Sequence, residues 1–232
     1  MYGISFVHIC KTVKGLRLSK VKVIWSTPDG EELIAYMARV SAPENQDNKE
    51  TGPKLVKYLI KHKHWSPLEM VNVCMEIETT RDIARQILRH RSFSFQEFSQ
   101  RYAVASNFEL SEVRMQDDKN RQNSLETDDY EMQNWWNAAQ LRVQSDAEFM
   151  YRAALNKGIA KETARKLLPE GLTMSKMYMQ GTLRSWIHYI DIRTDVATQK
   201  EHREVAEKCA KILEELFPNV MEAFYETRRS VV

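Results

Sequence analysis

The alternation of apolar and polar residues predicts a chain that mixes strands with helices. Residues 20–25 alternate and are β-branched, which is typical of a strand, and a turn at Gly30 leads into a helix expected over residues 31–40. A second helix is expected over residues 53–61, and residues 71–78 alternate like a half-buried strand. Strands and helices in this order indicate the α/β (α+β) class.

A further amphipathic helix is expected directly after the second strand. Thr79 or Thr80 can cap its start, and it is expected to run to about Arg91. At about 100° per residue its apolar side chains fall on one side, namely Ile83, Ala84, Ile87 and Leu88. The other side carries Arg81, Asp82, Arg85, Gln86 and Arg89.

The second half of the chain is predicted to be mainly helical. Residues 117–129 are polar and are expected to form a surface loop, followed by a long helix that runs to Lys157 and stops at Gly158. Aromatic residues predict a large buried face on that helix: Trp135, Trp136 and Tyr151. Shorter helices are expected over residues 160–168 and 184–193. A C-terminal helix is indicated by the apolar stripe of Val205, Cys209, Ile212 and Leu216.

Composition places the chain among ordinary globular proteins. Its 232 residues are 43% hydrophobic and 28% charged, and no repeat or linker divides them, so one domain over residues 1–232 is expected. The net charge of +2 creates no global field toward nucleic acid or anionic lipid. An anion site therefore has to come from local clusters of arginine.

The cysteines and the absence of long apolar runs indicate the compartment. Cys10, Cys74 and Cys209 lack the paired spacing of a zinc site or a redox pair, so reduced and buried thiols are expected. No apolar run reaches membrane-spanning length, and the first residues lack the pattern of an export signal. We therefore expect a cytoplasmic protein, in the host cytoplasm if the gene is viral.

Candidate chemistry concentrates in the basic triplet Arg89, His90 and Arg91. Consecutive residues cannot share one face, so Arg89 and Arg91 point in different directions and two phosphorylated ligands can meet here. The plainer alternative is that these cations neutralise a helix terminus and pair with Glu97 and Glu78. The chain has seven glycines and no GxGxxG after a strand, so a dinucleotide would be held by side chains. The nearby aromatic residues are expected to be core: Phe93, Phe95 and Phe98.

The stretch RHRSFSFQEFSQRY resembles the signature of the ThyX-type, flavin-dependent thymidylate synthases. The matching positions are Arg89, His90, Arg91, Ser94, Glu97, Ser99, Arg101 and Tyr102. Gln96 stands where the family commonly has Asn, and Ala197 where many members have His. Upstream and downstream matches extend the resemblance over most of the chain: His64, Ser66 and Pro67, Arg165 before Pro169, and the segment from Ser185 to Arg193.

The resemblance implies a fold, a reaction and an assembly. The expected fold is a ThyX-like single domain with a central mixed sheet flanked by long helices. The expected reaction is reductive methylation of dUMP to dTMP, with 5,10-methylenetetrahydrofolate as carbon donor and FAD, reduced by NADPH, as hydride source. The expected assembly is a homotetramer whose active sites are shared between subunits, with no nucleic-acid, membrane or metal partner.

The resemblance also implies roles for residues. Arg193 is expected to be the electrostatic catalyst, because a guanidinium can stabilise charge that develops on the uracil ring. The residues expected to bind dUMP are Gln86, Ile87, Leu88, Arg89, Glu97, Phe98, Ser99, Gln100, Arg101, Arg165 and Arg193. The residues expected to bind FAD are His64, Ser66, Arg89, His90, Arg91, Glu97, Thr182, Leu183, Arg184 and His188. Gln199 and Glu201 also match the family, but from the residues alone a solvated helix face is the preferred explanation for them.

Two other functions compete with this one. A non-catalytic nucleic-acid-binding protein would use the cluster from Arg81 to Arg101 to contact phosphates, although the low net charge argues against it. A hydrolase would need an acidic metal site, and Asp128, Asp129 and Glu131 are better explained as a solvated helix start.

Overall fold

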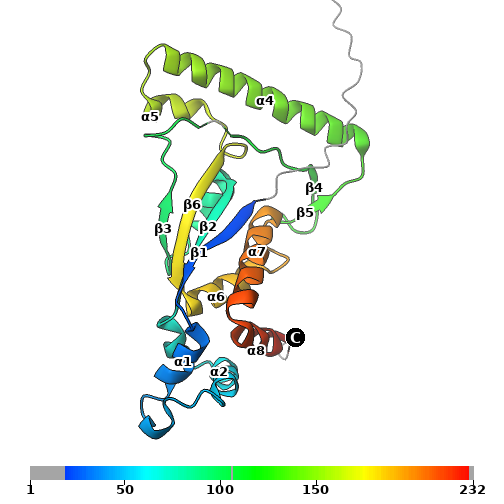
Figure 1. Ribbon diagram of the computed structural model, residues 1–232. Coiled ribbons are helices and arrows are strands. Elements are labelled where there is room, and N and C mark those ends of the chain that lie inside the picture. Colours follow the sequence, from blue (N-terminus) through cyan, green and yellow to red (C-terminus); the bar gives the residue numbers. More distant parts are fainter. Residues whose placement is uncertain (1–18, 106, 230–232) are drawn as a thin grey trace, which may run out of the picture.

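The centre of the molecule is a four-stranded sheet in the order β1-β2-β6-β3 (Figure 1). The computed structural model describes residues 19–105 and 107–229. The strands are β1 (Lys20–Ser26), β2 (Asn72–Thr80), β3 (Ser94–Glu97) and β6 (Met174–Thr182). Each pairs antiparallel with its neighbours, so the expectation of a mixed sheet was wrong.

The antiparallel pairing of β1 with β2 follows from how the chain connects them. Two helices, α1 (Gly30–Ala38) and α2 (Gly52–Lys61), lie between these strands in the sequence. They do not carry the chain to the opposite end of the sheet, because Thr27 N donates to Asn72 O at 2.9 Å and β2 therefore starts where β1 stops. A strand–helix–strand order gives a parallel pair only when the connection crosses over.

The remaining elements follow in chain order. The helices and 3₁₀ turns are η1 (Pro43–Asn45), η2 (Ser66–Glu69), α3 (Arg81–Ile87), α4 (Tyr130–Asn156), α5 (Lys161–Ala164), η3 (Arg165–Leu167), α6 (Leu183–Arg193), α7 (Lys200–Leu216) and α8 (Pro218–Arg229). A small hairpin of β4 (Arg114–Gln116) and β5 (Ser124–Glu126) lies in and beside the expected surface loop. The mixed α/β fold is confirmed, whereas β6 and α8 had not been predicted.

The main core lies between the sheet and the helices α1, α2, α6, α7 and α8. Trp186 is fully buried, and its indole Nε1 donates to Val73 O at 3.1 Å, which fixes α6 to β2. Cys74 and Cys209 are buried and free, as expected, while Cys10 lies outside the described residues. No helix among residues 19–105 and 107–229 is both long and apolar enough to cross a membrane.

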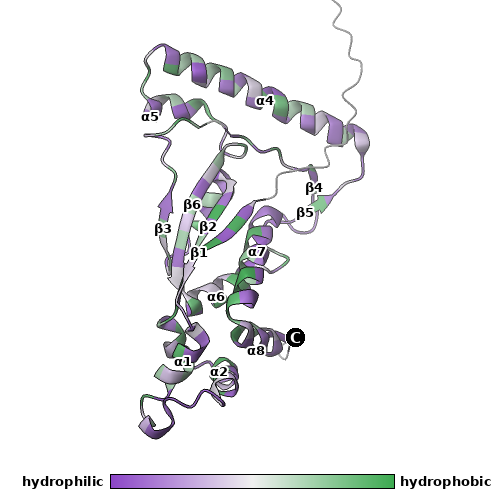
Figure 2. Cartoon of the chain, viewed as in Figure 1, coloured by the Kyte–Doolittle hydropathy of each residue, from purple (hydrophilic) through white to green (hydrophobic). Residues whose placement is uncertain are grey.

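The helix α4 lies at one end of the molecule, opposite α1 and α2, and is largely exposed (Figure 1). It ends before Gly158, whose φ of 81° suits glycine, as expected from the sequence. The expected large buried face is absent, because only Gln140, Tyr151 and Ala154 are buried and Trp135 is 63% exposed. Apolar residues nevertheless recur along its length (Figure 2).

Candidate active site

The basic triplet lies in a turn after α3 rather than at the end of the helix. The helix ends at Ile87, and His90 N donates to Ile87 O at 3.0 Å in the turn that follows. Phe93 then packs against Gly181 of β6, where a Cβ atom would lie 2.4 Å from the Phe93 ring. This close approach turns the chain into β3, which is why the helix stops short of Arg91. Phe98, at 37% exposed, is not the core residue expected.

The motif meets the end of α6 through one hydrogen bond. Arg193 Nε donates to His90 Nε2 at 2.9 Å, joining residues 103 positions apart. His90 therefore accepts on Nε2 and is neutral there. Burial, with the nearby charge of Arg193, lowers the pKa of His90 to about 4. The terminal nitrogens of Arg193 make no hydrogen bond in the described part of the chain, so they are available to a ligand.

A second polar cluster lies beside this contact. Gln86 Nε2 donates to Gln199 Oε1 at 2.7 Å, and Gln86 Oε1 lies 3.3 Å from His202 Nδ1. Arg114 donates to both carboxylate oxygens of Glu201, at 2.6 and 2.8 Å. Glu201 is therefore held in an ion pair and is not part of the solvated helix face that the sequence predicted.

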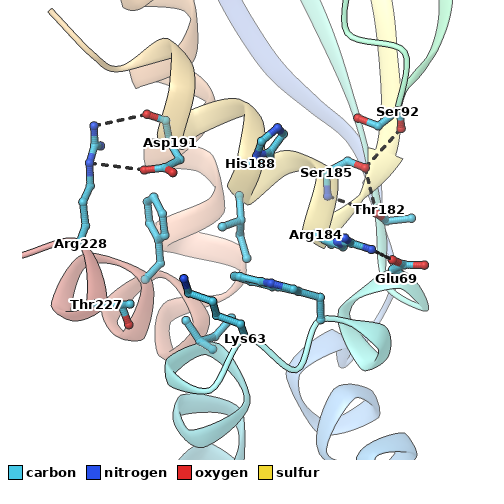
Figure 3. Close-up of a pocket in the computed structure, with 14 residues that line it drawn as sticks. Lys63, Glu69, Ser92, Thr182, Arg184, Ser185, His188, Asp191, Thr227 and Arg228 are labelled. Carbon is cyan, nitrogen blue, oxygen red and sulfur yellow. Dashed lines mark hydrogen bonds and ion pairs between the residues drawn. The ribbon is translucent and has the colours of Figure 1, made fainter. Parts of the chain in front are cut away.

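A cavity of about 810 Å³ opens on the other side of α6 (Figure 3). Three residues expected to bind FAD line it: Thr182, Arg184 and His188. Arg184 forms an ion pair with Glu69, and the cavity wall also carries Lys63 and Trp65. His64 and Ser66, also expected to bind FAD, are exposed beside these wall residues and do not line the cavity itself.

The third group of predicted residues lies toward the α5 end of the sheet. Glu97 accepts from Ser175 Oγ at 2.7 Å, and Arg101 forms an ion pair with Glu162 of α5 at 3.2 Å. Gln100 is 3% exposed, and its amide Nε2 has no partner among the described residues. No hydrogen bond or ion pair between described residues joins the segment from Glu97 to Arg101 to Arg193.

The remaining predicted residues divide between surface and core. Arg89 and Arg91 are exposed, and neither has an ion-pair partner within residues 19–105 and 107–229, so the expected pairing with Glu97 or Glu78 is absent. The side chains of Ile87 and Leu183 are fully buried in the core, which leaves their backbones for any ligand contact. Arg165 begins η3 and is half-buried.

Sequence reasoning missed several residues of these clusters. Lys63 and Trp65, which line the cavity, are sequence neighbours of His64 and Ser66. The motif match included His64 and Ser66 but not these two residues. His202 and Arg114 gave no sequence signal, because the partners that place them in this cluster, Gln86 and Glu201, are distant in the chain.

We expect the free energy of unfolding to fall as the pH drops below about 6.5. The folded pKa values are about 4 for His90 and about 3 for His202, mainly because of burial, whereas both return to about 6.5 on unfolding. Between these values the unfolded chain binds more protons, so acid favours unfolding, and stability is full above about 6.5. Thermal melts across this range measure how steeply the stability changes with pH, and His202→Asn should make that dependence weaker. An unchanged pH dependence in His202→Asn would contradict the contribution assigned to His202.

The chain is similar to proteins of one family over most of its length. Residues 22–219 match the family model described as thymidylate synthase complementing protein, Thy1. A flavin-dependent thymidylate synthase of Synechocystis sp. is 50% identical over 215 residues, which are 91% of this chain and 98% of that protein. A probable flavin-dependent thymidylate synthase of Paramecium bursaria Chlorella virus 1 is 50% identical over 202 residues, 87% of this chain and 93% of that one.

A solved structure has a similar fold. The UMP/dUMP methylase PolB from Streptomyces cacaoi, bound with 5-Br dUMP, superposes with a TM-score of 0.79 at 26% identity, covering 90% of this chain and 95% of that one.

Proposed function

The chain belongs to the Thy1 family of flavin-dependent thymidylate synthases, and from this premise we propose how its own residues serve the reaction. The reaction is reductive methylation of dUMP to dTMP, with 5,10-methylenetetrahydrofolate as carbon donor and FAD, reduced by NADPH, as hydride source. The observation that carries the proposal is the hydrogen bond between Arg193 and His90, which joins the basic motif to α6 between a polar cluster and a cavity.

The cavity on α6 fits FAD. Its volume of about 810 Å³ lies within the range of cofactor pockets. Its wall combines apolar surface at Trp65, Ile187 and Phe224 with the cations Lys63 and Arg184, as a flavin ring joined to a pyrophosphate requires. We assign FAD to this wall, to the neighbouring His64, Ser66 and Leu183, and to Arg89, His90, Arg91 and Glu97. When bound, FAD supplies the hydride.

We assign dUMP to the residues around Gln86, Arg89 and Arg193, completed by Arg165 and the segment from Glu97 to Arg101. Cationic side chains suit the phosphate, and Arg89 is exposed with no ion-pair partner among the described residues. The unpartnered, buried Nε2 of Gln100 is a donor that a ligand oxygen would satisfy. Leu88 and Phe98, with the backbone at Ile87, complete the set.

Arg193 is proposed to act as an electrostatic catalyst. Its Nε is engaged by His90, which orients the guanidinium, and its terminal nitrogens stay available. Negative charge on the uracil N3 and carbonyl groups makes C5 nucleophilic, and a fixed guanidinium stabilises that charge without transferring a proton. His90 stays neutral because of its low pKa, so it adds no competing cation beside Arg193.

The enzyme is proposed to be a homotetramer with shared active sites, each subunit a single domain over residues 1–232. Within the described residues of one chain, Arg101 pairs with Glu162 and shares no hydrogen-bond partner with Arg193, which supports assigning the two arginines of one dUMP site to different chains. The exposed apolar side chains of α4 offer a surface for that contact, among them Trp135, Leu141 and Phe149. The cytoplasmic location stays a prediction.

The nucleic-acid-binding alternative is replaced by the family assignment. Three of the arginines that it would use to contact phosphates are also engaged elsewhere, because Arg81, Arg85 and Arg101 are each in an ion pair with a carboxylate.

The hydrolase alternative had been set aside because Asp129 was interpreted as part of a helix start. In the structure Asp129 caps α4 by accepting from Met132 N at 3.0 Å.

Absorption spectroscopy tests the proposed sites. We expect the protein to bind FAD. In the absence of oxygen, NADPH should reduce the bound flavin and bleach its absorption. The flavin should be reoxidised only when dUMP and methylenetetrahydrofolate are both added. Arg184→Ala should weaken FAD binding, because it removes a cation from the cavity wall, whereas Arg39→Ala, on α1's C-terminal turn, should not. Full FAD affinity in Arg184→Ala would contradict the cavity as the FAD site.

A further inference from the structure

A run of hydrogen bonds leads from a half-buried ion pair to Gln86. It starts at Arg114, which is held to Glu201 at 2.6 and 2.8 Å. Gln199 Nε2 donates to Glu201 Oε2 at 3.1 Å. Gln86 Nε2 donates to Gln199 Oε1 at 2.7 Å. At the far end, Gln86 Oε1 lies 3.3 Å from Nδ1 of His202.

The direction of each bond in this run follows from the carboxylate at its start. Glu201 can only accept, so Gln199 must turn its NH₂ group to it and its carbonyl to Gln86. That carbonyl also only accepts, so Gln86 presents its NH₂ group to Gln199 and its own carbonyl to His202. His202 must then carry its proton on Nδ1. One ionised group therefore fixes the orientation of two amides and the tautomer of a histidine.

The consequence for Gln86 is a carboxamide that cannot reverse. A free carboxamide exchanges its donor and acceptor by rotating about 180° about its last bond. Here reversal would set two carbonyl oxygens against each other at Gln199 and an NH₂ group against Nδ1–H of His202. The run uses one donor and one lone pair of Gln86, which leaves one of each for a ligand.

The environment of His202 keeps this arrangement intact at neutral pH. His202 is fully buried on α7, and burial, with the neighbouring Arg193 and His90, lowers its pKa to about 3. A neutral ring preserves the single donor at Nδ1. It also places no second cation beside Arg193.

We propose that Gln199 and His202 are positioning residues that hold the carboxamide of Gln86 in one orientation for dUMP. The inference rests on the proposed role of Gln86 in dUMP binding. Loss of either partner lets the carboxamide rotate, so part of the binding free energy is spent on ordering it. FAD binding does not change, because neither residue lines the FAD cavity.

Titration calorimetry of dUMP into the FAD-loaded enzyme tests the proposal. We expect His202→Leu and Gln199→Leu each to weaken dUMP binding about 3- to 10-fold, the effect of one hydrogen bond. His202→Asn should bind nearly as the wild type, because its amide supplies a donor near the position of Nδ1. In a Gln86→Ala background, His202→Leu should weaken binding no further. Glu207→Gln, on the exposed side of α7, is the matched control.

The outcomes separate this inference from the proposed site. Wild-type affinity in both Leu variants, or effects that add to that of Gln86→Ala, would overturn the positioning role while Gln86 keeps its place at dUMP. Wild-type affinity in Gln86→Ala would overturn the role of Gln86 itself, and the inference with it. Because Gln199 is exposed, Gln199→Leu decides the question even if His202→Leu does not fold.

Discussion

Replacing Arg193 with Ala is expected to lower the turnover number for dTMP formation by about 100- to 1,000-fold while FAD remains bound. The terminal nitrogens of Arg193 are available, and its Nε is fixed by His90 at 2.9 Å. A charge that is already oriented stabilises the developing uracil anion without reorganisation, so its loss raises the barrier to methyl transfer. Tritium release from C5 of labelled dUMP, together with dTMP formation, measures the effect.

Two further variants show whether the role of Arg193 depends on the shape of its side chain. Arg193→Lys keeps the charge but loses the planar fork, so it should recover only part of the rate. Arg229→Ala, which removes an exposed arginine at the end of α8, should leave turnover unchanged. The pKa of His90, followed by NMR, should rise in Arg193→Ala, because a neighbouring cation has been removed. Turnover within about tenfold of the wild type would contradict the catalytic role.

The strands and helices with a simple period were predictable from the sequence. The helix α2 occupies residues 52–61 against an expected 53–61, because its apolar stripe and its proline at the start both pointed the same way. The strand β6 was missed although its buried side alternates perfectly, since that side is made of Ser175, Met177, Met179 and Gly181. None of these residues is β-branched or aromatic, the types that are enriched in strands, so the composition hid the pattern.

The sheet direction and the end of α3 depended on contacts that the sequence does not display. No local sequence pattern indicates that β2 starts beside the end of β1, or that the Phe93 ring packs directly against Gly181. The helical spacing of apolar residues therefore predicted a helix to about Arg91, whereas α3 ends at Ile87 and a turn follows. Long-range packing decided both features.

The residues of the candidate site were likewise predictable only in part from the sequence. Motif matching selected His90 and Arg193 separately, and the structure brings them into contact. It gave no hint of His202 or Arg114, since a histidine or arginine becomes informative only through its partners. Glu201 was predicted to be solvated because its ion-pair partner lies 87 positions away, in β4.

The residues that we propose to bind dUMP lie in two places, which suggests why assembly would matter to this enzyme. Arg193, at the end of α6, donates to His90, while Arg101 pairs with Glu162 of α5, and no hydrogen bond or ion pair between described residues joins Arg101 to Arg193. A helix such as α4, with three buried residues in 27, gains little from its own chain and would gain much from burying Phe149 and Leu141 on another. Subunit contact would then stabilise α4 and complete the site together.

Mixing two inactive variants is expected to restore activity if each dUMP site takes Arg193 from one subunit and Arg101 from another. Arg193→Ala and Arg101→Ala should each be nearly inactive alone. In randomly mixed tetramers, about a quarter of the sites would receive an intact Arg193 from one variant and an intact Arg101 from the other, so about a quarter of wild-type activity should return. Co-expression with two affinity tags, followed by assay of doubly purified tetramers, measures it.

The control for this complementation lies on α4. Adding Phe149→Glu to both variants introduces a charge on the exposed apolar surface, where Phe149 is 68% exposed in one chain, and should abolish both the tetramer and the recovered activity. Tyr36→Glu, the same kind of change at an exposed aromatic residue of α1, should affect neither. Doubly tagged tetramers without any recovered activity would mean that Arg193 and Arg101 serve dUMP from the same chain.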